Sequence, residues 1–194
     1  MNHLIVYAHP RKDSMNHAIL DTVKDTLEGK GSFVRVRNLY DMKWNPVLSE
    51  KDLKDIADGK LPKDIKEEQQ YVAEADQITL IYPIWWAGMP AILKGWVDRV
   101  FAYGFAYSYN ADGSVEGLLK GKKGFIINTM GETVPNYDES GMLRSMKQTT
   151  DENIFEFTGM TPAGHLFFGG VADLSEKEGR AILDEVRLAV EEKF

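Results

Sequence analysis

The sequence has 194 residues, of which 43% are hydrophobic and 27% charged, and these ordinary globular proportions argue against disorder. The net charge of −7 disfavours a nucleic-acid-binding protein, and no window approaches the roughly 18 consecutive apolar residues that a membrane span needs. The absence of cysteine excludes disulfides, cysteine-ligated metals and thiol catalysis. We expect one domain over residues 1–194. The N-terminus shows no signal-peptide pattern, so we expect a cytoplasmic protein.

Apolar strands alternate with amphipathic helices along the chain. The predicted strands are residues 4–8, 32–38, 77–82, 122–129 and 162–168, and the predicted helices are 14–29, 65–75, 90–101, part of 138–157, and 176–192. Residues 39–62 are predicted to be mostly loop with room for one helical turn, and the aromatic segment 103–109 to lie outside regular structure. The alternation predicts an α/β three-layer sandwich whose five-stranded parallel sheet has the flavodoxin-like order 2-1-3-4-5.

Ligands of such sheets bind beyond the carboxyl ends of the strands, at the switch in strand order. Three loops meet there: residues 9–16, 83–89 and 129–137. The first loop carries no G-x-G-x-x-G and no Walker motif. It opens a helix whose free N–H groups can hold a phosphate, to which His9, Arg11, Ser14 and Asn16 can add donors or charge. A plain helix cap explains this loop equally well.

The other two loops are distinctive for different reasons. Trp85 and Trp86 can wall a planar aromatic ligand, although a hydrophobic interface patch is the alternative. The third loop can present backbone N–H groups to the carbonyl edge of a ligand, or it can be an ordinary connection. His17 and His165 are predicted to be structural. No residues have metal-ligand spacing, and no Ser-His-Asp set can be assembled.

A long motif and several short ones identify a family resemblance. They are YPIWWAGMPAILKGWVDRVF at 82–101, GFAYSY at 104–109, YAHP at 7–10 and SMN at 14–16. The sequence resembles the NAD(P)H:quinone oxidoreductase family, the flavin-dependent enzymes related to DT-diaphorase and the bacterial modulator of drug activity B. The resemblance covers roughly residues 3–171 and is weak over 39–62 and in the terminal helix.

The resemblance implies positions for a flavin. The matching cofactor residues are His9, Ser14, Met15 and Asn16 at the phosphate; Pro83, Ile84, Trp85 and Trp86 beside the isoalloxazine ring; Thr129, Met130 and Gly131 at its N1/O2 edge; and Asp98 near the cofactor of a partner subunit. Trp86 and Met130, with Tyr107 and Tyr109 of the partner, would form the substrate pocket. Tyr137 matches a catalytic tyrosine that stabilises the reduced flavin. The histidine that follows this tyrosine in animal members has no counterpart over 138–148, and their Gly-Gly pair is Met130-Gly131 here.

The implied activity is that of a flavin-dependent NAD(P)H:quinone oxidoreductase. NAD(P)H would pass a hydride to flavin N5 and leave, and a quinone or similar planar acceptor would then take two electrons in the same pocket. The resemblance favours FAD, with FMN as the alternative, and a homodimer. Two other interpretations stay open: a flavodoxin-like electron carrier, and an accessory subunit of a potassium-efflux transporter.

Overall fold

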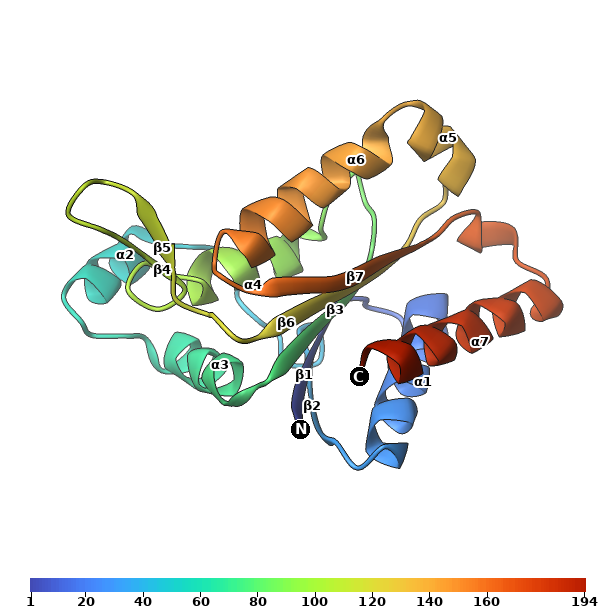
Figure 1. Cartoon of the computed structure of the whole chain (residues 1–194), viewed down its shortest axis with the longest axis horizontal. Coiled ribbons are helices and arrows are strands. Elements are labelled where there is room, and N and C mark those ends of the chain that lie inside the picture. The colour runs from blue at the N-terminus through green and yellow to red at the C-terminus, as the bar shows by residue number, and fades with distance from the viewer.

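Five parallel strands form the central sheet of the computed structural model, which describes residues 1–194 (Figure 1). The sheet order is β2-β1-β3-β6-β7. The bounds are β1 Asn2–Tyr7, β2 Phe33–Asn38, β3 Gln77–Pro83, β6 Lys123–Thr129 and β7 Thr161–Phe168. Strands β4 (Tyr107–Tyr109) and β5 (Val115–Gly117) form a separate hairpin, so the parallel strands alone follow the predicted 2-1-3-4-5 order under a different numbering.

Helices cover both faces of this sheet (Figure 1). Helices α1 and α7 pack on one face, and α3, α4, α6 and the π-helix η1 pack on the other. The bounds are α1 Met15–Gly29, α2 Glu50–Ala57, α3 Lys63–Glu74, α4 Ala91–Val100, α5 Val134–Glu139, α6 Met142–Lys147, η1 Gln148–Glu156, the short 3₁₀ helix η2 Val171–Asp173, and α7 Glu176–Lys193. None combines the length and apolar character that crossing a bilayer requires.

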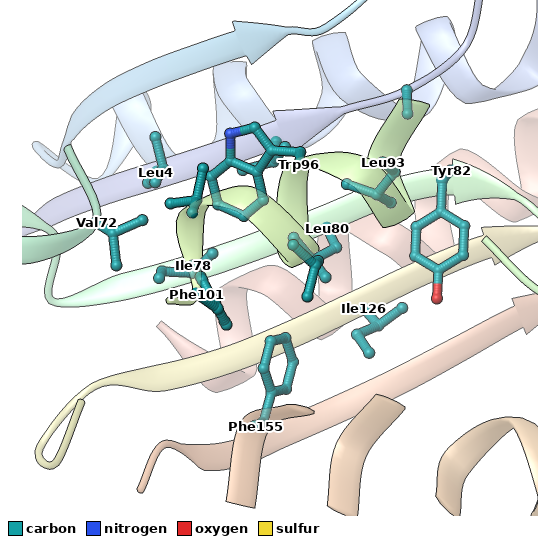
Figure 2. Close-up of a cluster of buried hydrophobic side chains, with 14 of the residues drawn as sticks. Leu4, Val72, Ile78, Leu80, Tyr82, Leu93, Trp96, Phe101, Ile126 and Phe155 are labelled. Atoms are coloured by element: carbon teal, nitrogen blue, oxygen red, sulfur yellow. The ribbon is translucent and has the colours of Figure 1, made fainter. Parts of the chain in front are cut away.

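The two faces of the sheet carry separate hydrophobic cores, because successive strand residues point to opposite sides. In β1, Leu4 and Val6 belong to the core under α3 and α4, whereas Ile5 and Tyr7 belong to the core under α1 and α7. Figure 2 shows part of the first core, with Trp96 of α4 beside β3. Trp96 is fully buried, and its indole N–H donates to a carboxylate oxygen of Glu68, 2.9 Å away, so its one polar group is satisfied.

Residues 39–62 are mostly loop, as predicted, but their helical part is the eight-residue helix α2, about twice the single turn that the sequence suggested. Ser49 and Asp52 form a capping box: the Asp52 N–H donates to Ser49 Oγ, and the Asp52 carboxylate accepts from the Ser49 N–H. The same carboxylate accepts from Nε of Arg99 in α4, at 3.2 Å. Because a helix this short is marginal alone, the tertiary ion pair with the buried Arg99 stabilises it.

Two further segments are more regular than predicted. Residues 107–109 of the aromatic segment are strand β4, so its placement outside regular structure is wrong there; Tyr107 pairs with Gly117 of β5. Residues 134–156 are helical except for a break at Ser140-Gly141, where the sequence predicted only partial helix over 138–157. Gly141 takes the left-handed conformation that makes this break (φ 76°).

Candidate functional site

A cleft of about 450 Å³ opens at the carboxyl ends of β1, β3 and β6. The three predicted loops all contribute to it. Its lining residues are His9, Arg11, Asp13, Ser14, Met15, Asn16, Pro83, Ile84, Trp85, Thr129, Met130, Gly131, Val171 and Ala172. This set includes every residue that the family resemblance assigned to the cofactor except Trp86 and Asp98.

The N-terminus of α1 forms one end of the cleft. Ser14 is its N-cap: Oγ accepts from the N–H of His17 at 3.2 Å, and the hydroxyl donates to the carbonyl oxygen of Arg11 at 2.9 Å. The Ser14 proton is therefore already used, which limits this side chain as a phosphate donor. The N–H groups of Met15 and Asn16 lie in the first helical turn and have no acceptor within the helix. These N–H groups and the positive end of the helix dipole attract an anion here.

His9 and Arg11 add donors at the same end. Nδ1 of His9 lies 3.1 Å from the Arg11 N–H and 3.3 Å from the Arg11 carbonyl oxygen; the shorter contact requires Nδ1 to accept, which places the ring proton of the neutral imidazole on Nε2. Burial lowers the pKa of His9, which favours this neutral form at pH 7. The Arg11 guanidinium forms two 2.9 Å hydrogen bonds with the Asp13 carboxylate at the exposed rim, where the ion pair is open to solvent.

Asn16 links the first loop to the third. Its side-chain Nδ2 donates to Oγ1 of Thr129 at 2.6 Å, and both residues are buried. Because the Thr129 oxygen accepts this bond, its own proton is free to donate. The Oδ1 of Asn16 is buried without any hydrogen-bond partner. A buried acceptor left unpaired is costly, so a ligand with a donor at this point would satisfy it.

The second loop contains a tight turn at residues 85–88. The N–H and C=O groups of Trp85 and Gly88 exchange two hydrogen bonds of 3.1 Å, and the residues between them, Trp86 and Ala87, have φ angles of 52° and 58°. Positive φ at both central positions is typical of a type I′ turn. The turn leaves the Trp86 side chain fully exposed and outside the cleft lining, whereas Trp85 is 43% exposed and lines it.

The third loop offers fewer N–H groups than the sequence suggested. The Met130 N–H donates to the carbonyl oxygen of Phe168 at 2.9 Å, and Met130 is buried. The N–H groups of Gly131 and Glu132 have no acceptor in the chain and stay available to a ligand. Sequence reasoning missed Val171 and Ala172 of η2. The glycine pair at 169–170, directly after the last predicted strand, could have indicated a loop at this edge.

The remaining predicted residues lie outside this cleft within one chain. Tyr137 of α5 packs against the core under α4 and α6. Tyr107 and Tyr109 lie on the β4–β5 hairpin with ring centroids 6.0 Å apart. Asp98 of α4 forms a surface ion pair with Lys94 at 2.5 Å. A parallel sheet with a helix N-terminus at its switch point defines the class of α/β proteins that hold a phosphorylated cofactor at this edge.

Comparisons with known proteins agree with this class. The family model described as a flavodoxin-like fold matches residues 1–194. An uncharacterized NAD(P)H oxidoreductase of Haemophilus influenzae is 37% identical over 185 residues, which cover 95% of this chain and 91% of that protein. NAD(P)H dehydrogenase (quinone) 1 of Cavia porcellus is 38% identical over 156 residues; the match covers 72% of this chain and 56% of that protein. The chain thus matches little more than half the length of this mammalian relative.

Solved structures give the same result. An NAD(P)H:quinone oxidoreductase from Methanothermobacter marburgensis superposes with a TM-score of 0.86 at 28% identity, over 98% of this chain and 95% of that one. An FMN-dependent NADH-azoreductase from Bacillus anthracis, solved with FMN, superposes with a TM-score of 0.78 over 98% of both chains; at 19% identity this likeness is one of fold. The chain belongs to the flavodoxin-like fold family, and its predicted resemblance to the NAD(P)H:quinone oxidoreductases is confirmed.

Proposed function

We propose that this chain is a single flavin-binding domain over residues 1–194 and acts as a flavin-dependent NAD(P)H:quinone oxidoreductase. The observation that carries the proposal is the pair of unused polar groups deep in the cleft: the buried Asn16 Oδ1 and the free proton of the Thr129 hydroxyl. They lie beside the N-terminus of α1. A cofactor that carries both a phosphate and hydroxyl groups would use the helix end for the phosphate and these polar groups for a hydroxyl. The names of the relatives support the same activity.

The cleft residues fit a flavin. The N–H groups of Met15 and Asn16, with Nε2–H of His9, would hold its phosphate. Pro83 and Trp85 would border its ring on one side, and the free N–H groups of Gly131 and Glu132 would donate to its carbonyl edge.

When bound, the flavin supplies two-electron transfer between NAD(P)H and a planar acceptor. FAD is the proposed form and FMN the alternative, since these residues would serve the part that the two cofactors share. The FMN-bound neighbour of the same fold supports a flavin in either form.

We also propose a homodimer with composite sites. Tyr103 and Tyr109 stack on each other, and Tyr107 lies between them and Phe157. Tyr103, Tyr109 and Phe157 are 55%, 57% and 38% exposed, and a second copy would remove this aromatic surface from water. In the dimer, Tyr107, Tyr109 and Asp98 would face the partner's cofactor. The catalytic role of Tyr137 and the substrate-facing roles of Trp86 and Met130 remain proposals.

The deciding experiment combines an absorption spectrum with a turnover assay. The purified protein should carry a noncovalent flavin, released by heat and identified by mass. It should oxidise NADH or NADPH in the presence of a quinone, with the parallel double-reciprocal lines of a ping-pong cycle. A protein that binds neither FAD nor FMN would disprove the proposal. A flavoprotein without NAD(P)H turnover would instead favour the electron carrier or the transporter subunit.

A further inference from the structure

His165 of β7 is buried between two hydrogen-bond acceptors outside the cofactor cleft. Its Nδ1 lies 2.8 Å from Oδ2 of Asp151 in η1, and its Nε2 lies 2.7 Å from Oδ1 of Asn128 in β6. The His165 side chain is 2% exposed and that of Asp151 is 14% exposed. Asp151 reaches the ring from the π-helix, a wide helical form that is found often at functional positions.

These contacts fix the number of protons on the imidazole and its partners. The Asn128 amide cannot be turned around, because its Nδ2 donates to the main-chain carbonyl of Tyr82 at 3.1 Å and a carbonyl has no proton to give. Oδ1 of Asn128 therefore faces His165, and Nε2 must carry a proton. A second proton must then lie between Nδ1 and the Asp151 carboxylate. Together His165 and Asp151 hold one proton more than a neutral imidazole and a carboxylate.

The surroundings act on this proton in both directions. Burial is the largest effect and lowers the pKa of His165 below its ordinary value; the hydrogen bond and the charge of Asp151 act to raise it, and the Lys147 ammonium acts to lower it. The geometry nevertheless favours the protonated pair. Without this proton, the negative carboxylate of Asp151 would face a lone pair on a ring nitrogen of His165 in a buried environment. The Thr150 hydroxyl donates its proton to the carbonyl oxygen of Met146 at 2.8 Å, so its 3.3 Å contact with the same carboxylate adds little. The Phe167 ring stacks on the imidazole with 3.9 Å between the ring centroids.

Asn128 connects this pair to the cofactor cleft. The Tyr82 carbonyl that it holds directly precedes Pro83, Ile84 and Trp85, which line the cleft. Pro83 has no N–H to anchor the end of β3. The next anchor is the Ile84 N–H, which donates to the carbonyl of Thr129 at 2.7 Å. Asn128 and Thr129, two neighbouring residues of β6, thus anchor the start of the 83–89 loop.

We propose that His165 and Asp151 are positioning residues for this cleft. The proton that they share at neutral pH keeps the Asn128 amide aligned with the Tyr82 carbonyl, and this contact holds residues 83–85, which form one wall of the cleft, in place. Losing the proton sets a lone pair of the imidazole against an acceptor oxygen of Asn128 or Asp151; this repulsion strains the bond between the Asn128 amide and the Tyr82 carbonyl and loosens residues 83–85. The identity of the ligand rests on the proposed function, whereas the protonation of the pair does not.

The first test measures the Kd of FAD, and of FMN where FAD does not bind, between pH 6 and 9 for four forms of the protein. Wild-type affinity should weaken about tenfold as the pH rises and one proton is lost. Asp151→Asn can donate its amide to Nδ1 and leave a neutral imidazole with its proton on Nε2, so its profile should be flat at high affinity. His165→Ala should be about tenfold weaker at pH 7. His3→Gln, which changes another buried histidine away from the cleft, should keep the wild-type profile.

The second test uses NMR of the flavin-free protein at pH 7. Two slowly exchanging, strongly downfield protons should belong to the hydrogen bonds of His165, and only the Nε2 proton should remain in Asp151→Asn. One ring-associated proton in the wild type would overturn the proposal. Both protons with a flat wild-type Kd profile would overturn the link to the cleft. If no flavin binds at all, the proposed function fails, while the NMR result still decides the protonation of the pair.

Discussion

Asn16 and Thr129 are 113 residues apart in the sequence, yet the amide of the first donates to the hydroxyl of the second at 2.6 Å. The bond joins the first turn of α1 to the end of β6, the two places where we propose that the phosphate and the ring of a flavin lie. It leaves Oδ1 of Asn16 buried and unpartnered. The cleft therefore contains an unsatisfied acceptor whose cost a ligand donor would remove.

Asn16→Ala should weaken flavin binding by roughly 1–3 kcal/mol, because both the ligand acceptor and the bond to Thr129 are lost. The folded state should persist, since the substitution also removes an unsatisfied buried oxygen. Equilibrium titration with FMN and FAD measures the effect. Asn110→Ala, at the tip of the β4–β5 hairpin, is the control and should bind normally. Unchanged affinity of the Asn16 variant would show that this side chain serves only the fold.

Changing Tyr107 and Tyr109 together to Ala should raise KM for the quinone severalfold while leaving the flavin content near that of the wild type. The reason is that the proposed dimer uses these rings as walls of the partner's acceptor site and not as phosphate ligands. Steady-state kinetics and sedimentation check it, with Val115→Ala on the same hairpin as control. An active monomer, or normal quinone kinetics in the double variant, would contradict the composite site.

Ala87→Gly should stabilise the protein by about 0.5–1 kcal/mol. Ala87 has a φ of 58°, a conformation that costs a residue with a Cβ about 1–2 kcal/mol. Glycine adopts it without this strain, and the conformational entropy that glycine loses on folding is a smaller cost. Urea denaturation provides the measurement. The same change at Ala18, inside α1, should have the opposite sign, with a loss of about 1 kcal/mol. Destabilisation at both positions would mean that the turn is not strained.

Gly95→Ala should destabilise the protein by at least about 1–3 kcal/mol. A Cβ at Gly95 of α4 would lie 2.1 Å from the carbonyl oxygen of Pro46, so the 39–62 segment would have to move off the helix. Gly29→Ala is the matched control: nothing lies within 4 Å of its added Cβ, and it should be neutral or stabilising. Thermal unfolding of the two variants distinguishes them, and equal melting temperatures would disprove the close contact.

His3 should make the protein sensitive to acid. Its Nε2 lies 2.7 Å from Oγ1 of Thr79, and burial lowers its pKa from 6.5 to about 4. The folded state therefore favours the neutral His3 ring. The contribution of this preference to the free energy of unfolding is complete above pH 6.5 and is lost as the pH falls from 6.5 to 4. The loss is at most roughly 3 kcal/mol. In His3→Gln, the slope of unfolding free energy against pH should be shallower in this window; an unchanged slope would contradict the assignment.

The strands and the three cleft loops could be predicted from the sequence because a buried parallel strand must be apolar on both faces. Runs such as residues 77–82 are therefore visible without any tertiary information. The order 2-1-3-4-5 and the meeting of the loops followed from general rules for such sheets. The full length of helix α2 was not predicted, although its capping residues Ser49 and Asp52 are close in sequence. The reason is that its stability depends on Arg99, 47 residues away from Asp52.

The sequence by itself determined which functional groups follow each strand: amide and hydroxyl groups follow β1 and β6, and tryptophans follow β3. Only the tertiary structure decided how these groups are used. It turned Trp86 outward through a left-handed turn, directed the Ser14 proton to the Arg11 carbonyl, and set His165 between partners 14 and 37 residues away. Periodicity reports only which face a residue occupies, whereas a hydrogen bond depends on which distant segments the packing of strands and helices brings within 3 Å.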